Sequence, residues 1–139
     1  MSGYESRPTE AVYLMAQRII LLCIAGAAGT LCRYGLSVLT HRIAGTAFPW
    51  GTLAVNIIGC FGVGLLWALF EHRWLIAPET RIIILIGFMG AFTTFSTYML
   101  ESAELIRTAH YFSAAANLFL QNGVGLIALL AGIAIGRWA

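Results

Sequence analysis

Four long runs of apolar residues, separated by short polar segments, make up most of the chain. The runs cover approximately residues 19–41, 51–70, 82–103 and 113–136. Each reaches the roughly 20 residues that an α-helix needs to cross the hydrocarbon core of a bilayer. The connecting segments leave no room for a soluble domain. We therefore predict an all-α membrane protein whose four transmembrane helices form one domain over residues 18–139.

The composition supports a protein that is embedded in a lipid bilayer. Of the 139 residues, 60% are hydrophobic and only 10% are charged, whereas soluble domains carry about 25% charged residues. Residues 1–17 are mixed and polar, and we expect them to form an N-terminal tail. A net charge of +2 without a basic run excludes nucleic acid as a partner.

The chain lacks the residue patterns of an enzyme or of a side-chain metal site. Cys23, Cys32 and Cys60 lie in apolar runs without metal-ligand spacing, which is typical of small buried side chains. There is no nucleophile–histidine–acid set, no central carboxylate pair and no glycine-rich phosphate loop. We therefore expect a protein that is not an enzyme.

The third apolar run contains an unusual mixture of residues between positions 87 and 98. Glycines, hydroxyl residues and phenylalanines are mixed there, although contact with lipid favours neither glycine nor hydroxyl groups. Such residues at membrane depth allow a helix to break or to approach a partner closely. Helical spacing predicts a small and polar face of Gly87, Gly90, Thr94, Thr97 and Glu101, and an aromatic face of Phe88, Phe92, Phe95 and Met99.

The other runs also carry polar residues at helical spacing. The second has Thr52, Asn56 and Gly59 on one face, and the fourth has Asn117 and Gln121. Each set alone could be a helix-packing contact, but together they indicate the wall of a polar path. These residues line it: Thr52, Asn56, Thr94, Thr97, Asn117 and Gln121.

The ionisable residues limit what such a path carries. Arg33 lies within the first run, where a charge costs about 2.5–3.5 kcal/mol on insertion scales unless it has a partner or a water-filled cavity. No carboxylate lies near the centre of a run, and Glu101 is at the end of the third. Hydroxyl and amide donors suit a small anion better than a cation.

Three motifs together resemble the Fluc (CrcB-type) fluoride channels over residues 19–137. They are Gly26-x-x-Gly29-x-x-x-Arg33-Tyr34, Gly51-Thr52-Leu53-x-Val55-Asn56-x-x-Gly59 and Gly87-Phe88-x-Gly90-x-x-Thr93-Thr94-Phe95-Ser96-Thr97. The resemblance implies a bacterial inner-membrane channel that exports fluoride passively and so limits its toxicity. It also implies an antiparallel, dual-topology homodimer in the lipid bilayer, with two pores lined by both subunits.

The same resemblance assigns roles to individual residues. The third helix is expected to break near its centre, where the backbone carbonyls of Gly90 and Thr93 hold a structural Na⁺ that is not transported. Asn56 matches a pore-lining amide, Phe95 a pore phenylalanine whose ring edge faces the ion, and Arg33 a vestibule cation.

The chain departs from the family pattern at two places. Tyr98 stands where the second pore aromatic is more often phenylalanine. The fourth helix has Asn117 and Gln121 where serine, threonine or tyrosine is common, although donor character is kept.

Two alternatives remain open at this point. A small dual-topology cation or multidrug exporter also has four helices and about this length, but a glutamate within the first helix would favour it and residues 19–39 contain none. A membrane scaffold would use the glycine stripes only to pack helices together.

Overall fold

The computed structural model describes residues 8–72 and 77–138, and this part of the chain is helical apart from short connections. The first two passages are single helices, α1 (Pro8–Ala44) and α2 (Trp50–His72). The third consists of α3 (Pro78–Ile82), the π-helical η1 (Ile83–Met89), α4 (Gly90–Phe92) and α5 (Phe95–Arg107). The fourth consists of α6 (Tyr111–Phe119), the π-helical η2 (Leu120–Val124) and α7 (Gly125–Trp138).

Four helical segments in the described ranges are long and apolar enough to cross a membrane. They are Glu10–Ala44, Trp50–Glu71, Pro78–Arg107 and Tyr111–Trp138. This confirms the predicted all-α membrane class with four spanning helices. α1 begins at Pro8, a residue well suited to a first helical turn, so residues 8–17 of the expected polar tail are helical. Residues 1–7 of that tail lie outside the described residues.

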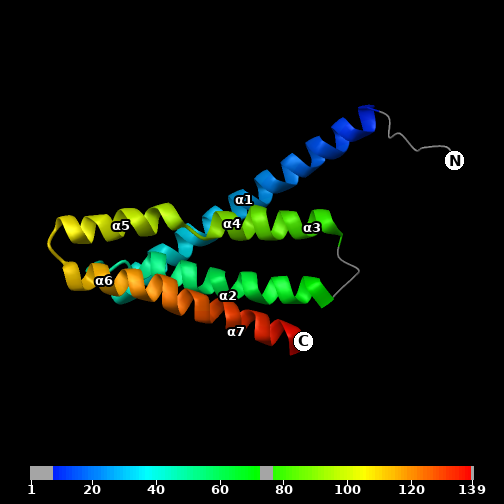
Figure 1. Ribbon diagram of the computed structural model, residues 1–139. Helices are drawn as coiled ribbons and strands as arrows, with labels where there is room; N and C mark the ends of the chain where they lie inside the picture. Colours follow the sequence, from blue (N-terminus) through cyan, green and yellow to red (C-terminus); the bar gives the residue numbers. More distant parts are fainter. Residues whose placement is uncertain (1–7, 73–76, 139) are drawn as a thin grey trace.

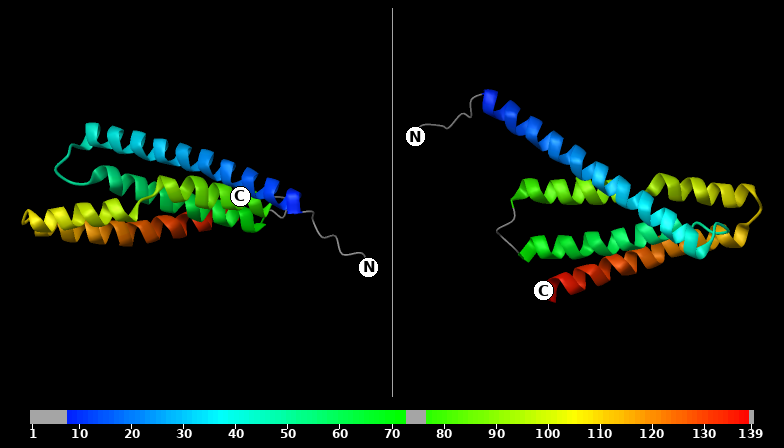
Figure 2. Two further views of the ribbon diagram at one scale, coloured as in Figure 1. Left: turned by 90° about the horizontal axis from the view of Figure 1, so that it is seen from above. Right: turned by 180° about the vertical axis from the view of Figure 1, so that it is seen from behind.

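The most extensive helix contact joins α2 and α7, which run side by side (Figures 1 and 2). Glycine makes this contact close. A Cβ atom at Gly64 would overlap the carbonyl oxygen of Leu129, and one at Gly132 would overlap that of Phe61. Because small residues let backbones approach in a membrane, the pair gains dispersion contacts that lipid alone does not provide.

α1 lies on one side of the other helices and crosses the third passage at an angle (Figure 2). Gly29 is buried at this crossing, where a Cβ atom would overlap the carbonyl oxygen of Phe88. Nearer its N-terminal end, the guanidinium of Arg18 donates to Glu79 Oε1 of α3 at 2.9 Å. α1 is thus fixed to the third passage both by close backbone contact and by an ion pair.

Two residues with extended backbone, Thr93 and Thr94, separate α4 from α5 (Figure 1). Their φ/ψ angles are −83°/162° and −150°/117°. Helical periodicity does not continue across such residues, so the predicted common aromatic face is wrong. Phe92 is 7% exposed in the core beside Val55, whereas Phe95 is 70% exposed.

The turn between α5 and α6 ends α5 with paired hydrogen bonds and a left-handed residue. Ala109 has φ of 60°, a conformation that glycine adopts far more readily. The His110 N–H donates to the Leu105 carbonyl at 2.8 Å, and the Ala109 N–H to the Ile106 carbonyl at 3.0 Å. These bonds satisfy the carbonyls at the helix end, as in a Schellman motif.

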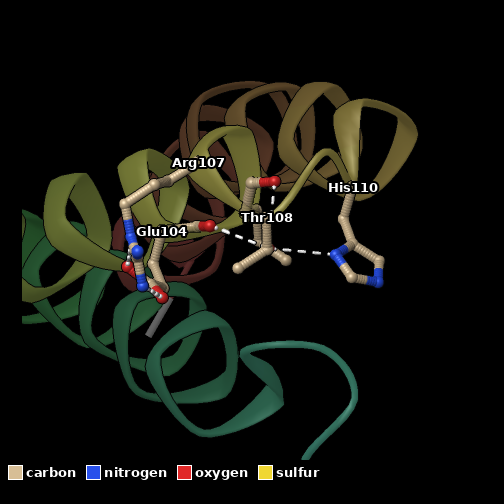
Figure 3. A network of polar contacts seen from close by, with 5 residues as sticks. Glu104, Arg107, Thr108 and His110 are labelled. Atoms are coloured by element: carbon tan, nitrogen blue, oxygen red, sulfur yellow. Dashed lines mark hydrogen bonds and ion pairs between the residues drawn. The ribbon is translucent and has the colours of Figure 1, made fainter.

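Side chains add a second set of contacts at the same turn (Figure 3). Arg107 pairs with both carboxylate oxygens of Glu104, at 2.8 and 2.5 Å. The Thr108 hydroxyl donates to the Glu104 carbonyl at 2.8 Å, and His110 Nδ1 lies 3.0 Å from the same hydroxyl. All four side chains are exposed, so they order the turn without adding much stability.

Ala109→Gly should raise the free energy of unfolding by about 1 kcal/mol, because glycine avoids the clash of a Cβ atom in the left-handed region. Equilibrium unfolding in detergent measures this change. Ala115→Gly, at an exposed position within α6, is the matched control and should lower stability by a similar amount. A stability loss in Ala109→Gly would contradict the assignment.

Candidate functional site

The Asn56 side chain of α2 pairs with the backbone of Thr94. The Thr94 N–H donates to Asn56 Oδ1 at 2.9 Å, and Asn56 Nδ2 donates to the Thr94 carbonyl at 3.0 Å. Backbone groups that leave a helix within a membrane need protein partners, because lipid offers none. One amide therefore satisfies both backbone polar groups of an extended residue.

Close approach of α2 to the interruption makes this pairing possible. A Cβ atom at Gly59 would overlap Cγ2 of Thr93, so the threonine methyl occupies the space that a side chain would fill. The Thr93 hydroxyl donates back to the Met89 carbonyl at 3.1 Å, which ends the preceding helix. Gly59 thus places Asn56 within reach of Thr94.

Thr94 also begins the next helix as the N-cap of α5. Its Oγ1 accepts from the Thr97 N–H at 3.3 Å and donates to Thr97 Oγ1 at 2.9 Å. A threonine at this position satisfies one of the free N–H groups of the first turn. The interruption therefore has a defined start and a defined end.

Two carbonyl groups lose their helical hydrogen-bond donors at the interruption. In a continuous α-helix, the Gly90 carbonyl would accept from the Thr94 N–H and the Thr93 carbonyl from the Thr97 N–H. Instead those N–H groups donate to Asn56 Oδ1 and to Thr94 Oγ1. Gly90 is exposed, and a Cβ atom there would meet nothing closer than 3.8 Å. Two hard oxygen atoms are thereby released from the helix ladder.

A chain of polar side chains runs from Asn56 into the fourth passage. Asn56 Nδ2 donates to Gln121 Oε1 at 3.0 Å, and Gln121 Nε2 donates to Asn117 Oδ1 at 3.5 Å. Asn117 Nδ2 then donates to the Ser102 hydroxyl at 2.9 Å, which donates to the Tyr98 carbonyl at 2.8 Å. Asn117 is fully buried. This network links α2, α5, α6 and η2 across the membrane interior.

Two clefts open beside the interruption, and Thr94 lines both. The Tyr98 cleft, of about 280 Å³, is lined by Asn56, Cys60, Val63, Thr93, Thr94, Phe95, Tyr98, Gln121, Asn122 and Leu129. The Arg33 cleft, of about 290 Å³, is lined by Thr30, Arg33, Tyr34, Ser37, Thr52, Thr94 and Thr97. Hydroxyls and a guanidinium dominate the second cleft, and amides with aromatic rings the first.

Most of the residues predicted from the sequence lie in these clefts. The Tyr98 cleft contains Asn56, Thr93, Thr94, Phe95, Tyr98 and Gln121, and the Arg33 cleft contains Arg33, Thr52, Thr94 and Thr97. Gly90 and Asn117 line neither cleft: Gly90 lies on the exposed surface, and Asn117 is buried in the network behind. Asn56 differs from a simple pore donor, because both of its N–H groups donate to protein oxygens.

Asn122 was not among the residues predicted from the sequence, although it lines the Tyr98 cleft and donates to the Tyr98 hydroxyl at 2.7 Å. The four-residue spacing from Asn117 selects Gln121 and places its neighbour on another face. The wider turn of the π-helical η2 brings both near the cleft. The sequence signal that could have identified Asn122 was the Gln-Asn pair inside an apolar run.

Glu101, at the end of the predicted polar face of the third helix, is hydrogen-bonded to the second helix. The Thr52 hydroxyl donates to its Oε1 at 2.8 Å.

Comparison with known proteins decides the family of the chain. Residues 20–133 match the family model described as CrcB-like protein, Camphor Resistance (CrcB). The chain belongs to the CrcB family. With four spanning helices, this CrcB chain is a multi-pass membrane protein.

CrcB relatives resemble the chain over nearly their whole length. A protein of Desulforapulum autotrophicum is 48% identical over 123 residues, which is 88% of this chain and 98% of the relative. Relatives from Solidesulfovibrio magneticus and Nitrosococcus oceani are 49% and 47% identical over the same shares. All three are named "Fluoride-specific ion channel FluC". An ion channel is not an enzyme class, in agreement with the sequence analysis.

Asn56→Ala should lower the free energy of unfolding by roughly 2 kcal/mol, since three hydrogen bonds of about 0.6 kcal/mol are lost and two backbone groups lose their partner. Chemical unfolding in detergent measures the loss. Ser96→Ala, at an exposed position two residues after Thr94, is the control and should stay within about 0.5 kcal/mol of the parent. Equal stability of the two variants would contradict a central role for the pairing.

Proposed function

We propose that this CrcB chain forms a fluoride-specific passive channel that exports F⁻ across the bacterial cytoplasmic membrane and so reduces fluoride toxicity. The names of its relatives support the ion. The geometry supports an anion through one observation, the meeting of two donor-lined clefts at Thr94. Among the described residues that line them, none is a carboxylate.

The physical requirement is to replace the water around a small anion. Fluoride holds its hydration shell strongly, so a pore must offer close donors in its place, while a larger anion fits poorly among them. The Arg33 cleft offers a guanidinium and hydroxyl groups. In the Tyr98 cleft, the rings of Phe95 and Tyr98 meet edge to face, with centroids 5.6 Å apart and planes at 77°. Such ring edges carry partial positive charge.

The proposed assembly is an antiparallel, dual-topology homodimer whose third helices meet at their interruptions. The support is the surface that one copy leaves uncovered. Gly90, Phe95 and Thr97 are exposed beside the extended residues. Irregular backbone at membrane depth is tolerated where protein or a water-filled cavity covers it, so a second copy is the natural cover. Each of the two pores would then have walls from both subunits.

The proposed cofactor is a structural Na⁺ held by the carbonyls of Gly90 and Thr93. The donor chemistry fits, because both carbonyls have lost their helical N–H donors and carbonyl oxygens are ligands for hard cations. Across residues 8–72 and 77–138, no group of three or more His, Cys, Asp or Glu side chains forms an alternative metal site. A bound cation would neutralise the released oxygens and hold the two copies in place.

Purified protein in liposomes should release F⁻ rapidly in response to a gradient and release Cl⁻ at least 100-fold more slowly. Ion-selective electrodes measure both rates. Liposomes without protein provide the control. Equal rates for the two anions, or no F⁻ release, would overturn the proposed function. Drug or cation transport in the same vesicles would favour a small dual-topology exporter, and no transport at all would favour a scaffold.

Replacement of Na⁺ by the large organic cation N-methylglucamine should abolish F⁻ release and lower the melting temperature of the detergent-solubilised protein. The reason is that the released carbonyls then lack a counter-charge at the interruption. Restoring Na⁺ should recover both properties. Unchanged release and melting without Na⁺ would rule out the cation site at Gly90 and Thr93.

A further inference from the structure

The amide of Asn122 has a single hydrogen-bonding orientation beside Tyr98. Its Nδ2 lies 2.7 Å from the Leu118 carbonyl oxygen and 2.7 Å from the Tyr98 hydroxyl oxygen. A carbonyl can only accept, so the atom facing Leu118 must be the nitrogen and not Oδ1. Each of the two amide hydrogens therefore has an acceptor, and the Tyr98 oxygen is one of them.

This orientation determines what the Tyr98 hydroxyl has left to offer. A phenol both accepts and donates, and here its oxygen accepts from Asn122. Within the described residues, this is the only hydrogen bond of the hydroxyl, so its own hydrogen has no acceptor among them. Tyr98 is only 3% exposed, and a buried O–H group without an acceptor is unfavourable. The described residues supply no acceptor for this O–H hydrogen.

The Tyr98 cleft is where such an acceptor would sit. Tyr98 and Asn122 both line it, as do Phe95 and Gln121. We infer that the Tyr98 hydroxyl donates a hydrogen bond to the permeating anion in this cleft, with Asn122 as the positioning residue that keeps the phenol oxygen as acceptor and its hydrogen free. This inference rests on the proposed function and deepens it.

The consequence for ion binding follows from the strength of the donor. A phenylalanine at this position offers a ring edge, whereas tyrosine adds an O–H group. Hydrogen bonds to a full negative charge are roughly twice as strong as those between neutral groups. The chain thus binds the anion more tightly here than a variant with phenylalanine would.

The test measures the F⁻ concentration at which release from liposomes reaches half its maximal rate. In Tyr98→Phe this concentration should rise about tenfold, which corresponds to the loss of one hydrogen bond to a charged group. Tyr111→Phe is the matched control, because Tyr111 is 66% exposed at the start of α6 and lines neither cleft. It should leave the half-saturating concentration unchanged.

A double-mutant cycle tests the part played by Asn122. Asn122→Leu should raise the half-saturating concentration about fivefold in the parent, because the hydroxyl can then turn away from the cleft. In the Tyr98→Phe background the same change should have at least threefold less effect, since no hydroxyl remains to be positioned. Asn122→Ala is the second variant, and melting temperatures identify any variant whose effect comes from loss of fold.

The outcomes separate this inference from the proposed function. If the parent releases no F⁻, the proposed function itself fails. If the parent releases F⁻ and Tyr98→Phe matches Tyr111→Phe, the hydroxyl does not bind the ion. If Tyr98→Phe weakens binding but the Asn122 changes act independently of it, Asn122 is not the positioning residue. The tenfold and coupled changes together support both assignments.

Discussion

The paired hydrogen bonds between Asn56 and Thr94 are the interaction on which the rest of this structure depends. Two extended residues within a membrane helix are unfavourable unless their backbone groups have partners. One amide provides these partners, while its second N–H extends the contact to Gln121. The release of the Gly90 carbonyl follows directly from this pairing. The exposed Phe95 and the clefts that meet at Thr94 lie beside it.

The pairing of Asn56 with Thr94 also explains the position of Gly59 in α2. An amide can reach a helix backbone only when the two helices are close, and Gly59 permits this by accommodating the methyl of Thr93. Gly64 and Gly132 hold α7 against α2 in the same way. Glycine therefore serves the site indirectly, because it sets the helix separation at which short polar side chains can bond.

Sequence patterns predicted the helices and most cleft residues, but not how those residues are connected. Apolar length was sufficient to locate four spans, and motif resemblance placed an interruption at Gly90 and Thr93, whereas the extended residues are Thr93 and Thr94. Periodicity failed beyond that point, since neither two extended residues nor a π-helical turn preserves a spacing of 3.6 residues. For this reason Phe92 and Phe95 were expected on one face and lie on different ones, and Asn122 was missed. The hydrogen-bond partners of Asn56 could not be predicted, because they depend on how closely α2 approaches the third passage, and no single segment of the sequence determines that distance.

The length of α1 bears on how the protein sits in its bilayer. From Arg18 to Arg42 the helix rises about 36 Å, close to a hydrocarbon core of about 30 Å crossed with some tilt. The exposed ion pair between Arg18 and Glu79 suits the level of the lipid headgroups on that side, where charged side chains remain hydrated. The helical turns between Pro8 and Gln17 extend past it, with Tyr13 suited to the headgroup layer. In the proposed antiparallel pair, one such extension would emerge on each face of the membrane.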